Sequence, residues 1–169
     1  MCFRLSPLPI TNMSIFIKYT YMSMKSHIKL WTKHLSMVQS ELGGLAVCPY
    51  AVRARYKILD RVRKKIRFEK DQTLLETLDV LLYLKEFRMK KKDMYELCDQ
   101  LNDTHKEYVF LADHWDEETQ IKNVRTNNGL YNLILCQKRS KLESARKFVR
   151  SKNYYKYWNK KYLKDVMST

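Results

Sequence analysis

Glycine and proline are scarce in this chain, and three of the six stand together in the stretch from Gly43 to Ala51. Both residue types mark points where a regular backbone ends or turns. The stretch follows an amphipathic segment and precedes a strongly basic one, so it separates two elements of the fold. Cys48 lies at this predicted turn, directly before Pro49, where a thiol is better placed for chemistry than inside a helix or a strand.

Length and composition predict one folded domain. The chain has 169 residues, of which 45% are hydrophobic, and its 12 Tyr, 6 Phe and 3 Trp are too many aromatic residues for a disordered chain. We expect residues 24–167 to form this domain. We expect 1–23 to be a loose tail or a translated upstream stretch, because Met22 and Met24 are alternative starts.

The net charge of +15 is the largest anomaly of the composition. It favours a polyanionic partner such as nucleic acid, an anionic membrane surface or a phosphorylated ligand. The alternative is a lysine-rich surface that is only solvated. No apolar run approaches the roughly 20 residues of a membrane span, and the four cysteines are far apart without zinc-site spacing. We therefore expect a soluble cytoplasmic protein with reduced thiols.

Hydrophobic patterns predict alternating helices and strands. Helices are predicted over 26–42, 51–59, 92–101, 141–150 and 154–166, the first with Ser26 and Gly43 as its caps. Strands are predicted over 65–69, 78–84 and 108–114, although 78–84 also fits a helix, and 130–137 is either a strand or the start of a helix after a turn at 127–129. This irregular order predicts an α+β fold, a compact domain in which helices pack on a small sheet of about three strands.

A partial family resemblance supports attention to the same turn. The segment Leu45-Ala46-Val47-Cys48-Pro49-Tyr50-Ala51 resembles the Leu-Cys-Pro-Phe-Ala signature of DUF1415, a family of uncharacterised bacterial proteins. The strand that ends in Ala112-Asp113-His114 resembles that family's strand before a His-Pro turn, and 127–135 is similar to its Asn-containing turn and apolar segment. This chain has Tyr50 where the family has Phe, and Trp115 where it has Pro. The resemblance implies no established reaction, but it points to Cys48 and His114 as candidates. Asn127, in the turn at 127–129, is a further candidate for substrate binding.

Cys48 and His114 form the first candidate site. A neighbouring imidazole or cation lowers the pKa of a thiol and makes it a nucleophile. We expect His114 to act as base or acid, with Asp116 as the carboxylate that orients it. Arg53 and Arg55 add positive charge, and Arg55 would bind an anionic group of the substrate. The alternative is a buried structural thiol and a surface histidine.

Other chemistry lacks its sequence motif. Asp113, His114 and Asp116 could hold a divalent ion, but no second histidine stands two or four residues from His114, so we expect no metal site. The glycine-rich nucleotide motifs, HExxH and GxSxG are all missing from the sequence. No cofactor is therefore indicated.

Two basic blocks support a non-enzymatic alternative, a nucleic-acid-binding module. Cations bind phosphates and aromatic faces stack on bases. The candidate residues are Arg61, Arg63, Lys64, Lys65 and Arg67 in one block, and Lys156, Trp158 and Lys160 in the other. In the second block, helical spacing favours the interpretation that Trp158 belongs to the core face of the last helix. Two functions thus stay open, an enzyme that acts on an anionic small molecule and a nucleic-acid binder; the reaction and the oligomeric state are not determined by the sequence.

Overall fold

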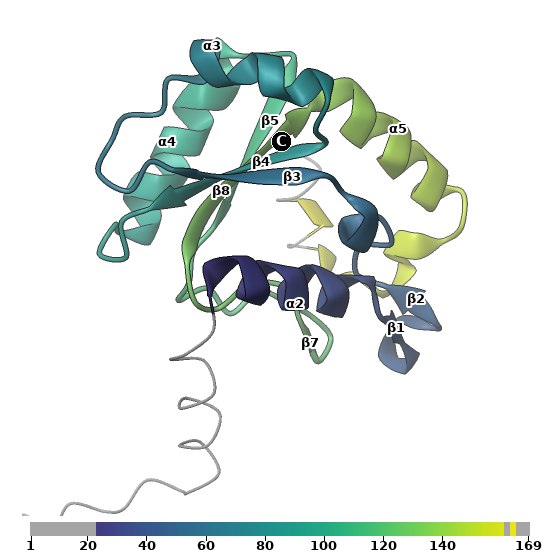
Figure 1. Ribbon diagram of the computed structural model, residues 1–169. Helices are drawn as coiled ribbons and strands as arrows, with labels where there is room; N and C mark the ends of the chain where they lie inside the picture. Colours follow the sequence, from purple (N-terminus) through teal and green to yellow (C-terminus); the bar gives the residue numbers. More distant parts are fainter. Residues whose placement is uncertain (1–22, 161–162, 165–169) are drawn as a thin grey trace, which may run out of the picture.

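Four strands form the central sheet of the protein. The computed structural model describes residues 23–160 and 163–164, so the predicted tail 1–23 lies almost wholly outside the described residues (Figure 1). The strand order is β3 (Tyr56–Asp60), β4 (Val80–Lys85), β8 (Asn132–Lys138) and β5 (Tyr108–Asp113). Because β3 is parallel to β4, and β8 is antiparallel to both β4 and β5, three strands run the same way. The loops that follow them, 61–67, 86–90 and 114–119, lie at one end of the sheet, here called the carboxyl end.

Helices and small hairpins surround this sheet. In the part of the chain that the structure describes, the α-helices with defined bounds are α2 (Met24–Ser36), α3 (Phe68–Asp71), α4 (Lys91–Thr104) and α5 (Arg139–Arg150), and short 3₁₀ helices span Ser40–Leu42, Ala51–Arg53, Gln72–Glu76 and Tyr154–Tyr157. Two hairpins pair β1 (Val38–Gln39) with β2 (Leu45–Ala46) and β6 (Gln120–Ile121) with β7 (Val124–Arg125). The predicted α+β class is confirmed, but the main sheet has four strands, and two further sheets have two each.

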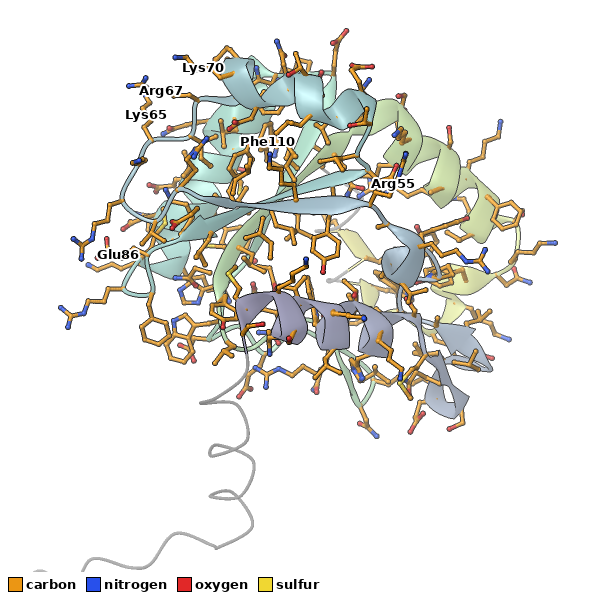
Figure 2. All side chains as sticks on the ribbon, viewed as in Figure 1. Arg55, Lys65, Arg67, Lys70, Glu86 and Phe110 are labelled. Carbon is orange, nitrogen blue, oxygen red and sulfur yellow. The ribbon has the colours of Figure 1, made fainter. Side chains whose placement is uncertain are left out.

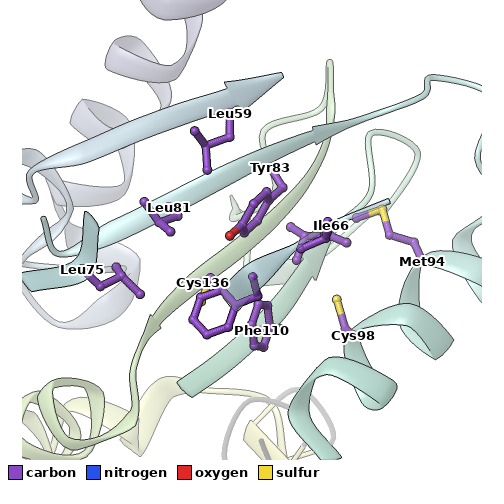
Figure 3. Packing of buried hydrophobic residues seen from close by; sticks show 11 residues of the cluster. Leu59, Ile66, Leu75, Leu81, Tyr83, Met94, Cys98, Phe110 and Cys136 are labelled. Carbon is purple, nitrogen blue, oxygen red and sulfur yellow. The ribbon is translucent and has the colours of Figure 1, made fainter. Parts of the chain in front are cut away.

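Apolar side chains form two separate buried clusters, one on each face of the sheet. Tyr83 and Cys136 point into the larger one, which α3 and α4 cover and which Figure 3 shows from close by. Leu82 and Leu133 point to the opposite face, where Ile28 of α2 packs on them. This alternation follows from the two-residue period of a strand. The sheet is therefore covered by helices on both faces.

The first helix begins earlier and ends earlier than its periodicity indicates. Ser23, not Ser26, is its N-cap, because the Ser23 hydroxyl accepts a hydrogen bond from the Ser26 N–H at 3.2 Å. The helix ends at Ser36, whose hydroxyl accepts the Val52 N–H at 2.9 Å and so ties the helix end to the turn after β2. The rest of the predicted helix forms the β1–β2 hairpin, where Gly43 adopts φ 65° at the end of a 3₁₀ turn.

Two predicted elements are wrong. The helix predicted over 51–59 stops after one 3₁₀ turn, and the chain then forms β3, in which Ile58 and Leu59 face opposite sides of the sheet. The strand predicted over 65–69 is a loop followed by the start of α3. Ile66 and Phe68 are both buried there in the same hydrophobic cluster. Their spacing of two residues, which resembles that of a strand, therefore arises in a loop and the start of a helix.

The elements with long, regular patterns agree with the structure. Helices α4 and α5 contain the predicted 92–101 and 141–150, and β5 covers nearly all of 108–114. The ambiguous segments 78–84 and 130–137 are the central strands β4 and β8. Cys98 is 3% exposed in the larger cluster, which confirms its assignment to the core.

The last predicted helix, over 154–166, is interrupted. Tyr154–Tyr157 is a 3₁₀ helix, and Trp158 after it is extended. Lys160 and residues 163–164 are helical, and the Leu163 N–H donates to the Asn159 carbonyl at 2.8 Å, while 161–162 and 165–166 lie outside the described residues. Within 23–160 and 163–164, no helix combines the length and the apolar character needed to cross a bilayer.

Candidate ligand pocket

A cavity of about 390 Å³ lies beside β5, at the edge of the sheet. Its walls come from α2, the turn 47–50, α4, β5, α5 and the segment 154–158, and most of the surface is apolar. Cavities of this size hold small organic molecules, and they combine apolar walls with a few polar groups. The position of those polar groups therefore decides what chemistry the pocket offers.

Asp113 is the most buried carboxyl in the wall of this pocket. It stands at the end of β5, on the strand face that also carries Val109 and Leu111, and it is 8% exposed. One carboxyl oxygen, Oδ2, accepts hydrogen bonds from the main-chain N–H and the side-chain amide of Asn128, while Oδ1 accepts none from any residue in the described part of the chain. Burial raises the pKa of Asp113 to about 7, an effect that the Asn128 hydrogen bonds oppose.

Glu117 brings a second carboxylate into the pocket. The Tyr95 hydroxyl donates to it, with distances of 2.7 and 2.8 Å to its two oxygens, and Lys91 lies 2.9 Å from Oε1. Glu117 thus has a counter-ion, whereas Asp113 lies in no ion pair among the described residues. The negative charge of Glu117 further raises the pKa of Asp113.

Aromatic rings form the wall contributed by the 154–158 segment. Tyr154, Tyr155 and Trp158 contact one another with ring centroids 5.1 to 5.5 Å apart, two of the pairs edge to face. All three line the pocket, as does Trp31 of α2. Their faces carry negative quadrupole density, which attracts cations.

The open edge of β5 adds main-chain polar groups. Asn102 pairs with Phe110 like a short piece of strand, because its side chain donates to the Phe110 carbonyl at 2.9 Å and accepts the Phe110 N–H at 2.8 Å. The N–H and the carbonyl of Phe110 therefore point away from β8. By the alternation of an antiparallel strand, the main chain of Ala112, two residues further on, points the same way, and Ala112 is one of the residues that line the pocket.

Among the described residues that line this pocket, Arg146 of α5 is the one with a basic side chain. Burial lowers its pKa, while the nearby Tyr155 acts in the opposite direction. Asp99, Asp113 and Glu117 line the same cavity, so carboxyl groups outnumber the guanidinium. This balance contrasts with the net charge of +15 of the whole chain.

Cys48 lies in the pocket wall, as expected for a functional thiol, but its environment does not activate it. Burial raises the pKa of Cys48, and the hydrogen bonds that oppose this come from the backbone of Tyr50 and Ala51. No imidazole or guanidinium contributes to the shift. The thiol is therefore neutral near pH 7, the opposite of the thiolate that nucleophilic attack requires.

His114 and Asp116 do not line the pocket with Cys48. His114 is buried, and both of its ring nitrogens contact the backbone: Nε2 lies 3.0 Å from the Met89 carbonyl, and Nδ1 accepts the Asp116 N–H at 3.2 Å. The hydrogen bonds of the described residues include none between Cys48 and either of them. The structure thus places His114 as a support of its own loop and does not form the expected pair.

The predicted substrate-binding residues also lie elsewhere. Arg53 is exposed, and Arg55 forms an ion pair with Asp79 at 3.2 Å. Asn127 is buried, donates to the carbonyls of His114 and Trp115, and accepts the Arg125 Nε–H at 2.6 Å. These contacts stabilise loops outside the pocket.

The two predicted basic blocks are on different sides of the molecule. Figure 2 labels Lys65 and Arg67 at the carboxyl end of the sheet, whereas the 154–158 segment lies on the opposite side in Figure 1. Trp158 is half-buried and packs on the small cluster around Leu42. Lys156 is exposed and lies over the ring of Tyr157, at 5.8 Å from its centroid. The structure therefore does not combine the two blocks into one surface.

Sequence reasoning missed Asp113 as a principal residue, although a signal was present. Val109, Leu111 and Asp113 share one face of an apolar strand, so their spacing places the carboxyl on a buried face. Arg146 and Glu117 carry no such local signal, because only tertiary packing brings α5 and the 114–119 loop to the same cavity. Within the described ranges, no three His, Cys, Asp or Glu residues are placed to hold a metal ion together.

Fold and pocket together define an α+β protein with a buried carboxyl in an apolar, aromatic-lined cavity. Comparison with protein-family models, with curated proteins and with solved structures finds no match to this chain. The resemblance to DUF1415 therefore stays a prediction. The function has to be argued from the pocket itself.

Proposed function

We propose that this protein binds a small organic amine in the pocket beside β5, with Asp113 as the counter-ion of the bound ammonium group. The observation that carries the proposal is the Asp113 carboxyl, which is buried in the wall without an ionic partner among the described residues. A buried charge is costly unless it is paired. A cationic ligand supplies the missing partner.

The aromatic wall supports the same class of ligand. Tyr154, Tyr155 and Trp158 present rings to the cavity, and an ammonium group held against such rings gains cation–π attraction. The apolar remainder of the pocket accommodates the hydrocarbon part of an amine. Asp113 on one wall and the ring cluster on another thus suit the two parts of an amphipathic cation.

Proton transfer is the chemistry available if the bound amine is a substrate. A carboxyl whose pKa lies near 7 can accept and return a proton at neutral pH. Asp113 would then be the base, and the Cys48 thiol would be a neutral part of the wall. This assignment replaces the Cys48–His114 enzyme, for which the contacts of the two residues give no support.

An anionic ligand, as expected from the sequence, is the second candidate. The specific observation in its favour is the basic residue Arg146, which lines the cavity. The first candidate is preferred because Asp113 and Glu117 oppose a carboxylate or phosphate in the same space. The two proposals predict opposite orders of affinity for ligands of equal size.

Three probes of similar size distinguish them: benzylamine, benzyl alcohol and benzoate. We expect calorimetric titration at pH 8 to show that benzylamine binds most tightly. Asp113→Asn keeps an amide oxygen for Asn128 but removes the charge, so it should weaken benzylamine binding about tenfold or more, the usual value of a charge-assisted hydrogen bond. Benzyl alcohol should bind the variant as well as the wild type.

The matched control is Asp116→Asn, which removes an exposed carboxyl from the loop that follows β5, outside the pocket. It should leave all three affinities unchanged. Tighter binding of benzoate than of benzylamine, with loss of that binding in Arg146→Gln, would establish the anionic candidate and reject the amine. Equal effects of Asp113→Asn and Asp116→Asn would reject a role for Asp113.

A further inference from the structure

Phe87 and Trp115 form a stacked aromatic pair at the carboxyl end of the sheet, away from the pocket. Their ring centroids are 4.7 Å apart and their planes differ by 22°. Phe87 is 58% exposed, so one face of the pair is open to solvent. An exposed, flat aromatic face of this kind is costly to keep in water and offers a stacking surface to a planar ligand.

The pair is held rigidly by Asn132 beneath it. The Asn132 side chain donates to the carbonyls of Glu86 and Phe87 at 2.8 and 3.2 Å, and it accepts the Trp115 N–H at 3.1 Å. Asn132 is 1% exposed, and it therefore fixes both ring-bearing loops from inside the protein. The hydrogen bond from His114 to Met89 adds a second link between the same loops.

Two basic loops adjoin this pair. Lys85, at the end of β4, donates from Nζ to the carbonyls of Arg61 and Lys64 at 2.9 and 3.0 Å, which fixes the 61–67 loop beside the 86–90 loop. Six exposed cations project from the two loops: Arg63, Lys64, Lys65, Arg67, Arg88 and Lys90. None of the six has an ion-pair partner in the described part of the chain; Lys91 and Lys92, next along, are paired with Glu117 and Glu96.

We propose that this surface, the Phe87–Trp115 pair with the basic loops 61–67 and 86–90, binds single-stranded nucleic acid. An unpaired base would stack on the open face of Phe87, while the phosphates on either side would contact the basic loops. Single strands expose the flat faces of their bases, whereas a duplex does not. The rigid ring pair thus favours a single strand over a duplex.

The carboxylates around the pair argue against an anionic membrane as the partner. Glu86, Asp116 and Glu118 are exposed in the same loops as the two rings. A flat anionic membrane would bring headgroups against these carboxylates as well as against the cations. A flexible strand can place its phosphates on the basic loops alone, so the mixed charge of this end of the sheet fits a strand better.

The test measures fluorescence anisotropy with labelled oligothymidine and oligouridine of about 16 nucleotides, a length within the usual range of single-strand sites. We expect binding that weakens as salt rises. Arg63→Gln and Lys65→Gln should each lower the log–log salt slope by about 0.7, the value for one contact with a single strand. Phe87→Ala should weaken binding about tenfold, within the range for loss of one stacked base.

Matched controls are available on other faces. Phe148→Ala removes a phenyl ring that is 59% exposed on α5, and Lys29→Gln with Lys33→Gln removes two exposed charges from α2. None of these should change binding. Three results would overturn the proposal: no binding of either oligonucleotide at low salt, tighter binding of a duplex, or loss of binding in Lys156→Gln and Lys160→Gln but not in the Phe87 and Arg63 variants. Binding to phosphatidylserine vesicles without binding to oligonucleotides would assign the surface to membranes instead.

Discussion

Asn128 holds one oxygen of the buried Asp113 carboxyl with two N–H groups, while the other oxygen accepts no hydrogen bond from the described residues, and Asp113 lines the pocket. This arrangement leaves the carboxyl oriented and without an ion pair among the described residues; the charge of Arg125 lowers its pKa, but less than burial raises it. Desolvation raises the pKa of Asp113 and the Asn128 hydrogen bonds lower it. Desolvation is the larger effect, so the pKa is raised overall. The pH dependence of stability follows from that sign.

Asp113 should make the folded protein less stable as the pH rises. Its pKa is about 7 in the folded state and 3.8 as a model value, so the folded state holds a proton that the unfolded state has lost between these values. The contribution is full below about pH 4 and is lost as the pH rises through about 7, amounting to about 4 kcal/mol. Urea unfolding of wild type and Asp113→Asn across pH 4–8 measures it. Parallel curves for the two proteins would contradict the expectation, and Asp116→Asn is the control.

Asn102→Ala should destabilise the protein by about 2 kcal/mol, the order expected when hydrogen-bonding groups lose their partner. The substitution leaves both the N–H and the carbonyl of Phe110 without the Asn102 amide at the edge of the sheet. Asn102→Asp keeps the acceptor and should cost less. Asn123→Ala, at an exposed position in the β6–β7 turn, should change the free energy of unfolding by less than about 0.5 kcal/mol. Equal effects of Asn102→Ala and Asn123→Ala would show that water replaces the Asn102 amide at no cost.

The Cys48 thiol should react slowly with alkylating reagents at neutral pH. The measurement is the alkylation rate against pH in a chain whose other cysteines, Cys2, Cys98 and Cys136, are replaced by Ala. Because burial raises the pKa of Cys48, the apparent value should lie above the ordinary 9.0, and unfolding in urea should restore the ordinary rate. His114→Ala should leave the rate profile unchanged. An apparent pKa near 7 that rises in His114→Ala would revive the Cys48–His114 enzyme.

Gly43→Ala should cost more stability than Gly44→Ala. Both glycines have positive φ, 65° and 80°, so alanine loses about 1 kcal/mol at either position. A Cβ at Gly43 would also lie 2.5 Å from the Tyr157 hydroxyl oxygen, whereas nothing lies within 4 Å of a Cβ at Gly44. We expect a further loss of about 1 kcal/mol for Gly43→Ala, the lower end of the cost of overpacking. Equal unfolding midpoints for the two variants would mean that the Tyr157 ring moves aside freely.

Local pattern was a sound guide where an element carries many regularly spaced apolar residues. The bounds of helix α4 and strand β5 are predicted within a few residues, because the spacing of their apolar residues matches the period of a helix or a strand. The β3 strand was missed because Lys57 and Asp60 interrupt its apolar residues and its partner β4 is about twenty residues away. Pairing, not local pattern, makes 56–60 a strand.

The candidate site was predicted in part. Cys48 does reach the pocket, because the turn that carries it packs against the β5 side of the sheet. His114 follows Asp113 directly, yet the two residues point to different places, the pocket and the 86–90 loop. Sequence proximity could not distinguish them, but the two-residue period of the strand could. Phe87, in a short loop between two longer elements, carried no signal before its stacking partner was known.

The strand order has a consequence for how the chain is made. β8 is the last strand of the main sheet along the chain, yet it lies between β4 and β5. These two strands pair with β8 and not with each other. During synthesis β3 and β4 can pair as soon as they emerge, but β5, although α4 can already pack on it, has no neighbouring strand until residue 138 is available. A ribosome-bound chain that stops before β8 should therefore recruit chaperones and resist folding, and the sheet should close in one late step.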